Sequence, residues 1–192
     1  MPGDRIQMDT KKLTAGKYQY TAIDDCSRWR VLGIYPGRNA INTLLFLERV
    51  FEEFPFPIQR IQTDRGREFF AVKVQEKLKE YCIKFRPIKP HSPHLNGKVE
   101  RSQKTDLQEF YSIVGFDSPD LEDEIEQWQF HYNWHRPHGS LNGKAPIDVV
   151  CELNDKTPIT DEVTSNYKPT EERIQEQNYK LDLELKKLKR CL

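Results

Sequence analysis

The sequence predicts a mixed α/β domain in which three antiparallel strands precede a βαβ unit and helices flank the sheet. Three segments near the start, residues 4–10, 17–24 and 29–35, are rich in aromatic and β-branched residues that alternate with other types. Only short connections separate them, which favours antiparallel pairing. From residue 39 onward helical periodicity alternates with short apolar runs, and this order indicates a right-handed βαβ crossover.

The βαβ part begins with a helix that Asn39 can cap and that ends near Phe54, before Pro55 and Pro57. Its apolar face carries Leu44, Leu47, Phe51 and Phe54. A strand over residues 58–64 follows. A second helix over residues 72–81 is expected to bury Val74, Leu78 and Tyr81, and residues 83–86 form a short fifth strand.

A proline-rich loop over residues 87–97 precedes a helix for which Asn96 is the expected N-cap. We expect its outer stripe to hold Glu100, Lys104, Gln108 and Tyr111, while a second stripe turns toward the body: Val99, Gln103, Leu107, Phe110 and Val114.

A further helix over residues 121–135 has a core-like stripe of Leu121, Ile125, Trp128 and Tyr132. His131 and His135 lie four residues apart on it and could share a metal. No third ligand at zinc-site spacing follows, so a surface or packing role is the better interpretation.

The chain divides by composition into a domain, a linker and a tail. Residues 1–150 are enough for one sizeable core. Apolar residues thin out over residues 151–169, which we interpret as a linker. In residues 170–192, Ile174, Leu181 and Leu188 recur every seven residues, which predicts a C-terminal helix that docks on its own core or on a partner copy.

Charge is balanced overall but uneven along the chain. The 30 Lys and Arg residues equal the 30 Asp and Glu residues, so net charge says nothing about nucleic acid. Residues 84–104, however, hold six bases and one acid. This basic stretch either suits a polyanionic substrate or merely solvates a loop and a helix face.

Cysteine usage and hydropathy bear on the compartment. The four cysteines are widely spaced, without a C-x2-C pair, and no signal peptide is visible, which favours reduced thiols inside a cell. No apolar run approaches the length of a membrane span, so we predict a soluble, intracellular chain with no membrane association.

Three carboxylates stand at points where the predicted elements converge. Asp9 ends the first strand-like run, Asp64 ends the strand before Gly66, and Glu100 begins a helix, with thirty-five residues between Asp64 and Glu100. Three such groups cannot all stay charged at one place without a cation, and hard oxygen ligands suit Mg²⁺. Asp24 and Asp25 are rival carboxylates, although adjacent acids in a tight connection favour a turn-forming role.

The set Asp9, Asp64 and Glu100 resembles the DDE motif of retroviral-type integrase and insertion-sequence transposase catalytic cores. Supporting phrases resemble that family too: Thr-Asp-Arg-Gly-Arg-Glu-Phe over residues 63–69, Ser-Pro-His-Leu-Asn-Gly-Lys-Val-Glu-Arg over residues 92–101, Tyr132-Asn133, and Arg136-Pro137-His138. Two acids at this spacing would by themselves be weak evidence for the family, but the whole set of motifs in this order is strong evidence. The resemblance covers about residues 4–150.

The resemblance implies an RNase H-like fold and metal-dependent cleavage and strand transfer at the ends of mobile-element DNA. It implies that Asp9, Asp64 and Glu100 are the catalytic and metal-binding residues, holding two Mg²⁺ or Mn²⁺ ions with DNA bound. It further implies a homo-oligomer of two or more copies whose partners are element ends and target DNA. The residues that it suggests for DNA contact are His94, Asn96, Lys98, Arg101 and Lys104.

Two positions depart from the usual family pattern. His94 stands where Gln is common, and Arg65 stands where Asn is frequent, which puts the DNA-end preference in doubt rather than the chemistry. Such transposases place a helix-turn-helix region before the core. The chain begins almost at the first strand, so we expect an excised core or one subunit product.

Two other functions are compatible with the same fold. One is a plain RNase H-like nuclease, against which the Asn96–Arg101 phrase and the Arg136–His138 stretch argue. The other is a DNA-binding regulator that no longer catalyses, against which the three intact carboxylates argue.

Overall fold

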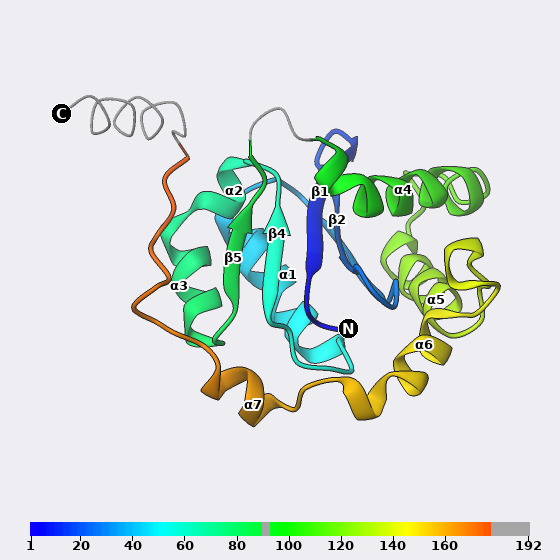
Figure 1. Cartoon of the computed structure of the whole chain (residues 1–192). Coiled ribbons are helices and arrows are strands. Elements are labelled where there is room, and N and C mark those ends of the chain that lie inside the picture. The colour runs from blue at the N-terminus through cyan, green and yellow to red at the C-terminus, as the bar shows by residue number, and fades with distance from the viewer. Residues whose placement is uncertain (90–92, 178–192) are drawn as a thin grey trace.

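The computed structural model describes residues 1–89 and 93–177 of the chain. Five strands form one mixed sheet in the order β3-β2-β1-β4-β5 (Figure 1). β1 pairs antiparallel with β2 and β2 with β3, whereas β4 is parallel to β1 and β5 is parallel to β4. This confirms the predicted mixed α/β fold. The strands span Ile6–Thr14, Lys17–Asp24, Arg30–Tyr35, Arg60–Thr63 and Lys84–Pro87.

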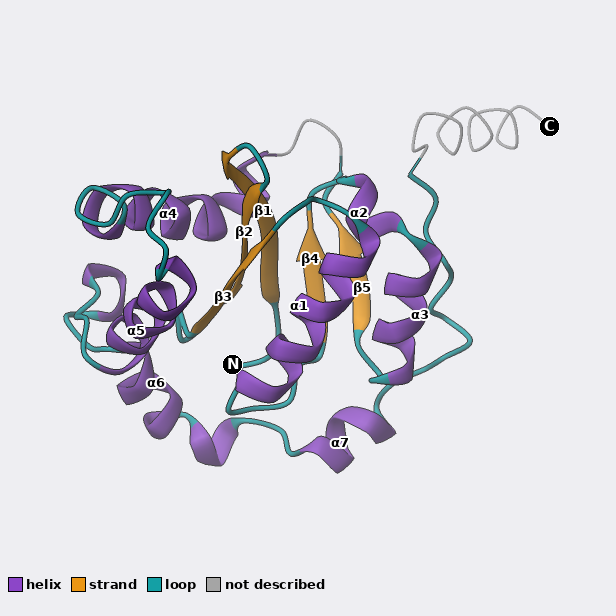
Figure 2. Cartoon of the chain, turned by 180° about the vertical axis from the view of Figure 1, so that it is seen from behind, coloured by secondary structure: helices purple, strands orange, loops and turns teal. Residues whose placement is uncertain are grey.

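Helices cover both faces of the sheet. One face carries α1, α2 and α3, and α1 crosses in front of the strands when the molecule is seen from behind (Figure 2). α4 and α5 lie on the other side, against β1, β2 and β3. The α-helices are Ala40–Glu53, Arg67–Phe70, Val72–Glu80, Gly97–Thr105, Leu121–Trp134, Pro146–Glu152 and Thr160–Ser165, numbered α1 to α7. None of the helices in the described ranges is long and apolar enough to cross a membrane.

Two apolar clusters occupy the two faces because strand side chains alternate in direction. On β3, Val31 belongs to the larger cluster under α1 and α3, and the next residue, Leu32, belongs to the smaller cluster under α5. The smaller cluster also contains Phe110, Leu121 and Ile125. Burying both faces of the sheet fixes its position between the two helical layers.

The predicted helix faces are mostly confirmed. Asn39 caps α1 as expected, with its side chain accepting a hydrogen bond of 3.0 Å from the backbone N–H of Asn42. Val74 and Leu78 of α3 are buried. The expected burial of Tyr81 is wrong, because the helix ends there and the ring, 49% exposed, stacks on Phe51 with ring centroids 4.2 Å apart.

The helix that follows the proline-rich loop changes its winding part-way. α4 ends at Thr105, and Asp106–Phe110 forms a π-helical turn in which the N–H of Tyr111 donates to the carbonyl of Asp106, at 2.8 Å. The extra residue per turn rotates every later side chain. Tyr111 is therefore buried, and its predicted place on the outer stripe beside Glu100 is wrong.

A buried ion pair joins this helical turn to the sheet. Arg30 of β3 is fully buried, and its Nη1 lies 2.6 Å from Oδ1 of Asp106, which is 1% exposed. Gln19 of β2 donates to the other carboxylate oxygen of Asp106 at 2.8 Å. Asn133 of α5 accepts from the backbone N–H of Arg30 and donates to its carbonyl. One network thus fixes α4 and α5 on β2 and β3.

The segment expected to be a linker carries short helices. Residues 151–169 contain the end of α6, a 3₁₀ turn at Asn154–Lys156 and α7. Residues 172–177 then pass beside β5 and α3, where Glu172 forms a two-pronged ion pair with Arg86 at 2.7 and 2.6 Å (Figure 1). The residues described after position 170 are not helical, and most of the predicted C-terminal helix, from residue 178 on, lies outside the described part of the chain.

Replacing one partner of the buried pair should be costly. Asp106→Asn leaves the Arg30 guanidinium buried without a countercharge, so we expect the free energy of unfolding to fall by about 3–5 kcal/mol. Urea denaturation followed by circular dichroism measures this change. The control is Glu171→Gln, which removes an ion pair with Lys168 whose side chains are 65% and 69% exposed. It should change stability by less than about 1 kcal/mol, and equal effects of the two substitutions would contradict the role given to Asp106.

Candidate active site

Strand register brings the first two carboxylates together. In the parallel pairing of β1 and β4, Met8 lies opposite Thr63. The next residue is Asp9 on β1 and Asp64 directly after β4, so the two residues are neighbours. β1 continues to Thr14, so the expectation that Asp9 ends the first strand is wrong: Asp9 lies within β1 and pairs with Thr21, whereas Asp64 begins the turn after β4.

A tight turn holds Asp64. Its Oδ1 accepts a hydrogen bond of 2.9 Å from the backbone N–H of Gly66. A Cβ atom at Gly66 would lie 2.7 Å from the carboxylate of Glu68, so the turn has no room for a side chain there. Glu68 itself is buried and pairs with Arg38 at 3.3 Å, which gives it a structural role in this turn.

Glu100 reaches the same edge on the first turn of α4. The start of this helix is fixed by β1, because the side-chain oxygen of Gln7 accepts from the backbone N–H groups of Lys98 and Val99, each at 3.2 Å. These are two of the N–H groups that the first turn of a helix leaves without a partner. Asn96 occupies the N-cap position as predicted, but its side chain makes no capping bond.

A second glutamine connects α4 to Asp9. Gln103 donates from Nε2 to Oδ2 of Asp9 at 3.1 Å, while the backbone N–H of Thr10 donates to Oδ1 at 2.8 Å. Gln7 and Gln103 therefore hold the helix and the strand in register on either side of the carboxylates. Sequence analysis missed Gln7 altogether and assigned Gln103 only to the body-facing stripe, because glutamines have no distinctive spacing in a strand or a helix.

The charges of Asp64 and Glu100 both act on Asp9. The pKa of Asp9 is raised from 3.8 to about 6, chiefly by burial, then by the charge of Asp64 and to a smaller extent by that of Glu100. Hydrogen bonds from Thr10 and Gln103 oppose this rise. The described residues contain no preformed group of three or more His, Cys, Asp or Glu side chains able to hold a metal. The carboxylates thus share one edge without being drawn tightly together.

The rival carboxylates have structural partners. Asp24 is fully buried and accepts hydrogen bonds from the backbone N–H groups of Gly3, Cys26 and Ser27 and from the Ser27 hydroxyl. Asp25 pairs with Arg5 and Lys98. The prediction that these two acids form a turn is confirmed.

Known protein families match two parts of the chain. The models of two integrase core domain families match residues 1–93 and residues 81–146, and together they cover most of the chain. A curated relative, "Putative integrase ORF3" of Spiroplasma virus SpV1-C74, is 25% identical over 174 residues. The chain belongs to the integrase core domain family.

The structural comparison agrees with this membership at the level of the fold. The catalytic core domain of BIV integrase superposes with a TM-score of 0.66 and 19% sequence identity, over 80% of this chain and 97% of the BIV chain. The predicted RNase H-like architecture is therefore confirmed. The viral relative aligns over 78% of this integrase core chain and 48% of its own length, so the chain spans about half of that relative.

The residues suggested for DNA contact differ in exposure. Arg101 and Lys104 are exposed on α4, and Lys98 is partly buried against Asp25. Asn96 is only 5% exposed, which does not favour a contact with DNA. His94 lies in the 3₁₀ turn Pro93–Asn96, and its side chain is outside what the structure describes.

The histidine pair of α5 in this integrase core makes ring contacts. The rings of His131 and His135 have centroids 6.2 Å apart, and His131 stacks on Trp128 while His135 meets Phe130 edge-on. Among the residues that the structure describes, neither belongs to a group able to hold a metal. This agrees with the packing role favoured by the sequence.

Burial of Asp9, together with the nearby charges of Asp64 and Glu100, predicts that the metal-free site lowers stability. Asp9→Asn should raise the free energy of unfolding at pH 7 by up to about 3 kcal/mol, because the raised pKa means that folding disfavours the charged carboxylate. The pKa of Asp9 is higher in the folded state than in the unfolded state. The protonated carboxyl therefore stabilises the fold at pH values below the unfolded pKa, and this stabilisation is lost as the pH rises through the folded pKa. Relative to the variant, wild type should therefore lose stability as the pH rises from about 4 to about 6.

Urea denaturation in EDTA across this pH range measures the difference. Asp161→Asn, which alters an exposed aspartate of α7, is the matched control and should show no such pH-dependent difference from wild type. A gap between wild type and Asp9→Asn that stays constant with pH would contradict the proposed repulsion.

Proposed function

We propose that this chain is the catalytic core of a DDE transposase or integrase that cleaves phosphodiester bonds and joins mobile-element DNA ends to target DNA. The observations that support it are the register of β1 and β4, which sets Asp9 beside Asp64, and the charges of Asp64 and Glu100, which add to burial in raising the pKa of Asp9. Membership of the integrase core domain family supports it.

The residues of the site fit a divalent cation. All three are carboxylates, the hard oxygen ligands that Mg²⁺ and Mn²⁺ prefer. A bound cation would compensate the negative charge that makes the carboxylates repel one another. Asp9, Asp64 and Glu100 would hold it. Bound there with DNA, two such ions would polarise the scissile phosphate and lower the pKa of the attacking hydroxyl or water.

The chain's own groups orient these ligands. The backbone N–H of Thr10 and the side chain of Gln103 each donate to one oxygen of Asp9, and the Gly66 N–H donates to one oxygen of Asp64. Lys104 is exposed one helical turn after Glu100 and is placed to contact a backbone phosphate of the bound strand. We assign it that role in preference to an ion pair with Glu100, since the structure has no such pair among its described salt bridges.

The rest of the biological assembly remains a prediction. We expect two or more copies to act together on two element ends, and we expect the protein to work in the bacterial cytoplasm or nucleoid. Because the chain spans about half of its viral relative, the activity of the longer protein is likewise proposed rather than observed.

Glu100→Gln provides the sharpest test of the function. The substitution keeps the size and helix propensity of an exposed side chain, so folding and bulk DNA binding should survive. Loss of one ligand charge should reduce Mg²⁺-dependent nicking and strand transfer by about a hundredfold or more. Oligonucleotide cleavage and joining assays on the element's candidate ends measure both steps.

The matched control for this test is Glu76→Gln, which alters an exposed glutamate of α3 and should retain activity. Near wild-type turnover by folded Glu100→Gln would refute the assignment of the three carboxylates. If wild type binds DNA but neither nicks nor joins it with Mg²⁺ or Mn²⁺, the regulator without catalysis replaces the proposal. Nicking without joining would favour the plain nuclease.

Metal affinity should depend on DNA. Mg²⁺ usually retains several waters and relies on one or two carboxylates together with substrate phosphates. Calorimetric titration of Mg²⁺ should therefore give weak binding to the protein alone and tighter binding once DNA is present. Equal and tight binding in both titrations would contradict a site completed by the substrate.

A further inference from the structure

A short segment after α7 docks beside the turn that carries Asp64. Residues 172–177 run past β5, which is an edge strand of the sheet, and past α3 (Figure 1). They form no helix or strand. The hydrogen bonds that hold them use side chains of β5, of α3 and of the Asp64 turn. We call residues 172–177 the strap.

Two buried polar side chains anchor the strap. Glu172, which is 8% exposed, forms its two-pronged ion pair with Arg86 of β5. Gln75 of α3, which is 2% exposed, donates to the carbonyl of Gln175 at 3.0 Å and accepts from the N–H of the same residue at 2.7 Å. Buried and charge-assisted bonds are stronger than exposed ones because water competes less for them. These two contacts therefore fix where the strap lies.

The end of the strap exchanges hydrogen bonds with Arg65. Nη2 of Arg65 donates to the carbonyls of Glu176 and Gln177, at 3.0 and 2.9 Å. In the other direction, Nε2 of Gln177 donates to the carbonyl of Arg65 at 3.1 Å. The guanidinium also lies over the ring of Phe70, 4.8 Å from its centroid. Arg65, which departs from the usual family pattern, thus has a structural reason in this chain.

A single peptide group connects Gln177 to Asp64. The carbonyl of Arg65 and the N–H of Gly66 belong to the same planar peptide. The N–H donates to Oδ1 of Asp64 at 2.9 Å, and the carbonyl accepts from Gln177. Because the group is planar, holding its carbonyl also fixes the direction of its N–H. Hydrogen bonds linked in this way polarise and strengthen one another.

We propose that Gln177, held in place by the strap, is a positioning residue that orients the Asp64 carboxylate through the Arg65–Gly66 peptide. The bond from Gln177 is exposed and weak by itself. The anchors at Glu172 and Gln75 make it effective, because they raise the local concentration of Gln177 beside the turn. The consequence for metal binding rests on the proposed function, whereas the orientation of Asp64 does not.

Two readouts on the full chain test the proposal. Amide hydrogen exchange, followed by NMR in EDTA, reports on two N–H groups: that of Gly66, which donates to Asp64, and that of Gln175, which is protected while the strap is docked. Mg²⁺-dependent DNA cleavage gives kcat, the KM for DNA and the Mg²⁺ concentration at half-maximal rate.

Reversing the charge of one anchor should release the strap. Glu172→Arg sets two guanidinium groups against each other at β5. We expect the Gly66 amide to exchange about tenfold faster and the half-maximal Mg²⁺ concentration to rise about tenfold, while the KM for DNA stays within about twofold. The reversed pair, Glu172→Arg with Arg86→Glu, should recover both values. The matched control is Glu171→Arg, which makes the same charge change one residue earlier, at an exposed side chain, and should alter neither.

A second variant removes only the proposed donor. Gln177→Met keeps the length of the side chain but cannot donate to the Arg65 carbonyl. The Gly66 amide should exchange about threefold faster. The Gln175 amide and the free energy of unfolding should keep their wild-type values, because the anchors are intact.

Three results would overturn the proposal. One is Gly66 exchange that neither Glu172→Arg nor Gln177→Met changes, which would leave the strap a purely stabilising role. Another is a reversed pair in which the Gln175 amide is protected again while Gly66 still exchanges fast. The third is faster cleavage after release, since the strap would then inhibit the site.

Failure of the strap inference and failure of the proposed function give different results. If wild type never cleaves DNA but both variants speed Gly66 exchange, Gln177 orients Asp64 without the proposed chemistry. If cleavage depends on Glu100 while both variants keep wild-type Gly66 exchange and Mg²⁺ dependence, the function stands and the strap inference is wrong.

Discussion

The arrangement of this integrase core depends on the ion pair between Arg30 and Asp106. Both groups are almost completely removed from water, and desolvation makes such a pair costly unless every charge finds partners. Here Gln19 and Trp128 donate to Asp106, Nη1 of Arg30 also donates to Ser102, and the guanidinium lies over the ring of Tyr132. In the described part of the chain, Nε and Nη2 of Arg30 are buried without a hydrogen-bond partner, so the ring face of Tyr132 is what stabilises that side of the charge. The contacts come from β2, β3 and α5, so satisfying this pair places the helical layer on the sheet. The position of α4, and with it the position of Glu100, follows from that placement.

The carboxylates of the active-site edge lower the stability of the fold, whereas the buried core raises it. Three carboxylates share one edge, and the raised pKa of Asp9 shows that folding confines charge that it does not compensate. Hydrogen bonds from Gln103 and from the Gly66 N–H hold Asp9 and Asp64 in place in spite of that repulsion. Such repulsion is expected at a site whose negative charge is neutralised by a bound ligand.

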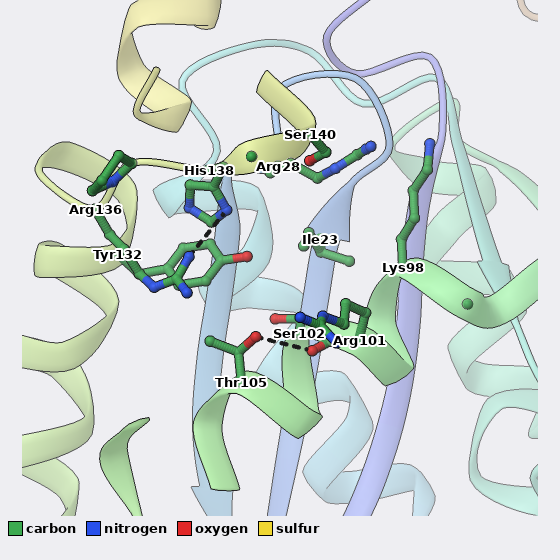
Figure 3. A pocket seen from close by; sticks show the side chains of 13 residues that line it. Ile23, Arg28, Lys98, Arg101, Ser102, Thr105, Tyr132, Arg136, His138 and Ser140 are labelled. Carbon is green, nitrogen blue, oxygen red and sulfur yellow. Dashed lines mark hydrogen bonds between the residues drawn. The ribbon is translucent and has the colours of Figure 1, made fainter. Parts of the chain in front are cut away.

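Different sides of α4 carry different kinds of side chain. The side with Glu100 faces the carboxylate edge, and the side with Lys98 and Arg101 lines a cavity of about 460 Å³ (Figure 3). The helix is short, and its start is fixed by Gln7 of β1, two residues before Asp9. A change at that strand would therefore disturb both sides of α4 together.

The sequence by itself predicted the mixed α/β class and the order of strands and helices along the chain, and it singled out the three carboxylates through a family resemblance. Those features follow from local alternation, from helix periodicity and from the ordered phrases around Asp64 and Glu100. Only the tertiary structure decided which side chains support them. Tyr111 turns inward because the π-helical turn Asp106–Phe110 places an extra residue before it, and Gln7 caps a helix that begins far along the chain, at Lys98 and Val99, 91 and 92 residues away. No local pattern encodes contacts of this kind, because their energies arise from burial and long-range pairing rather than from propensity along the chain.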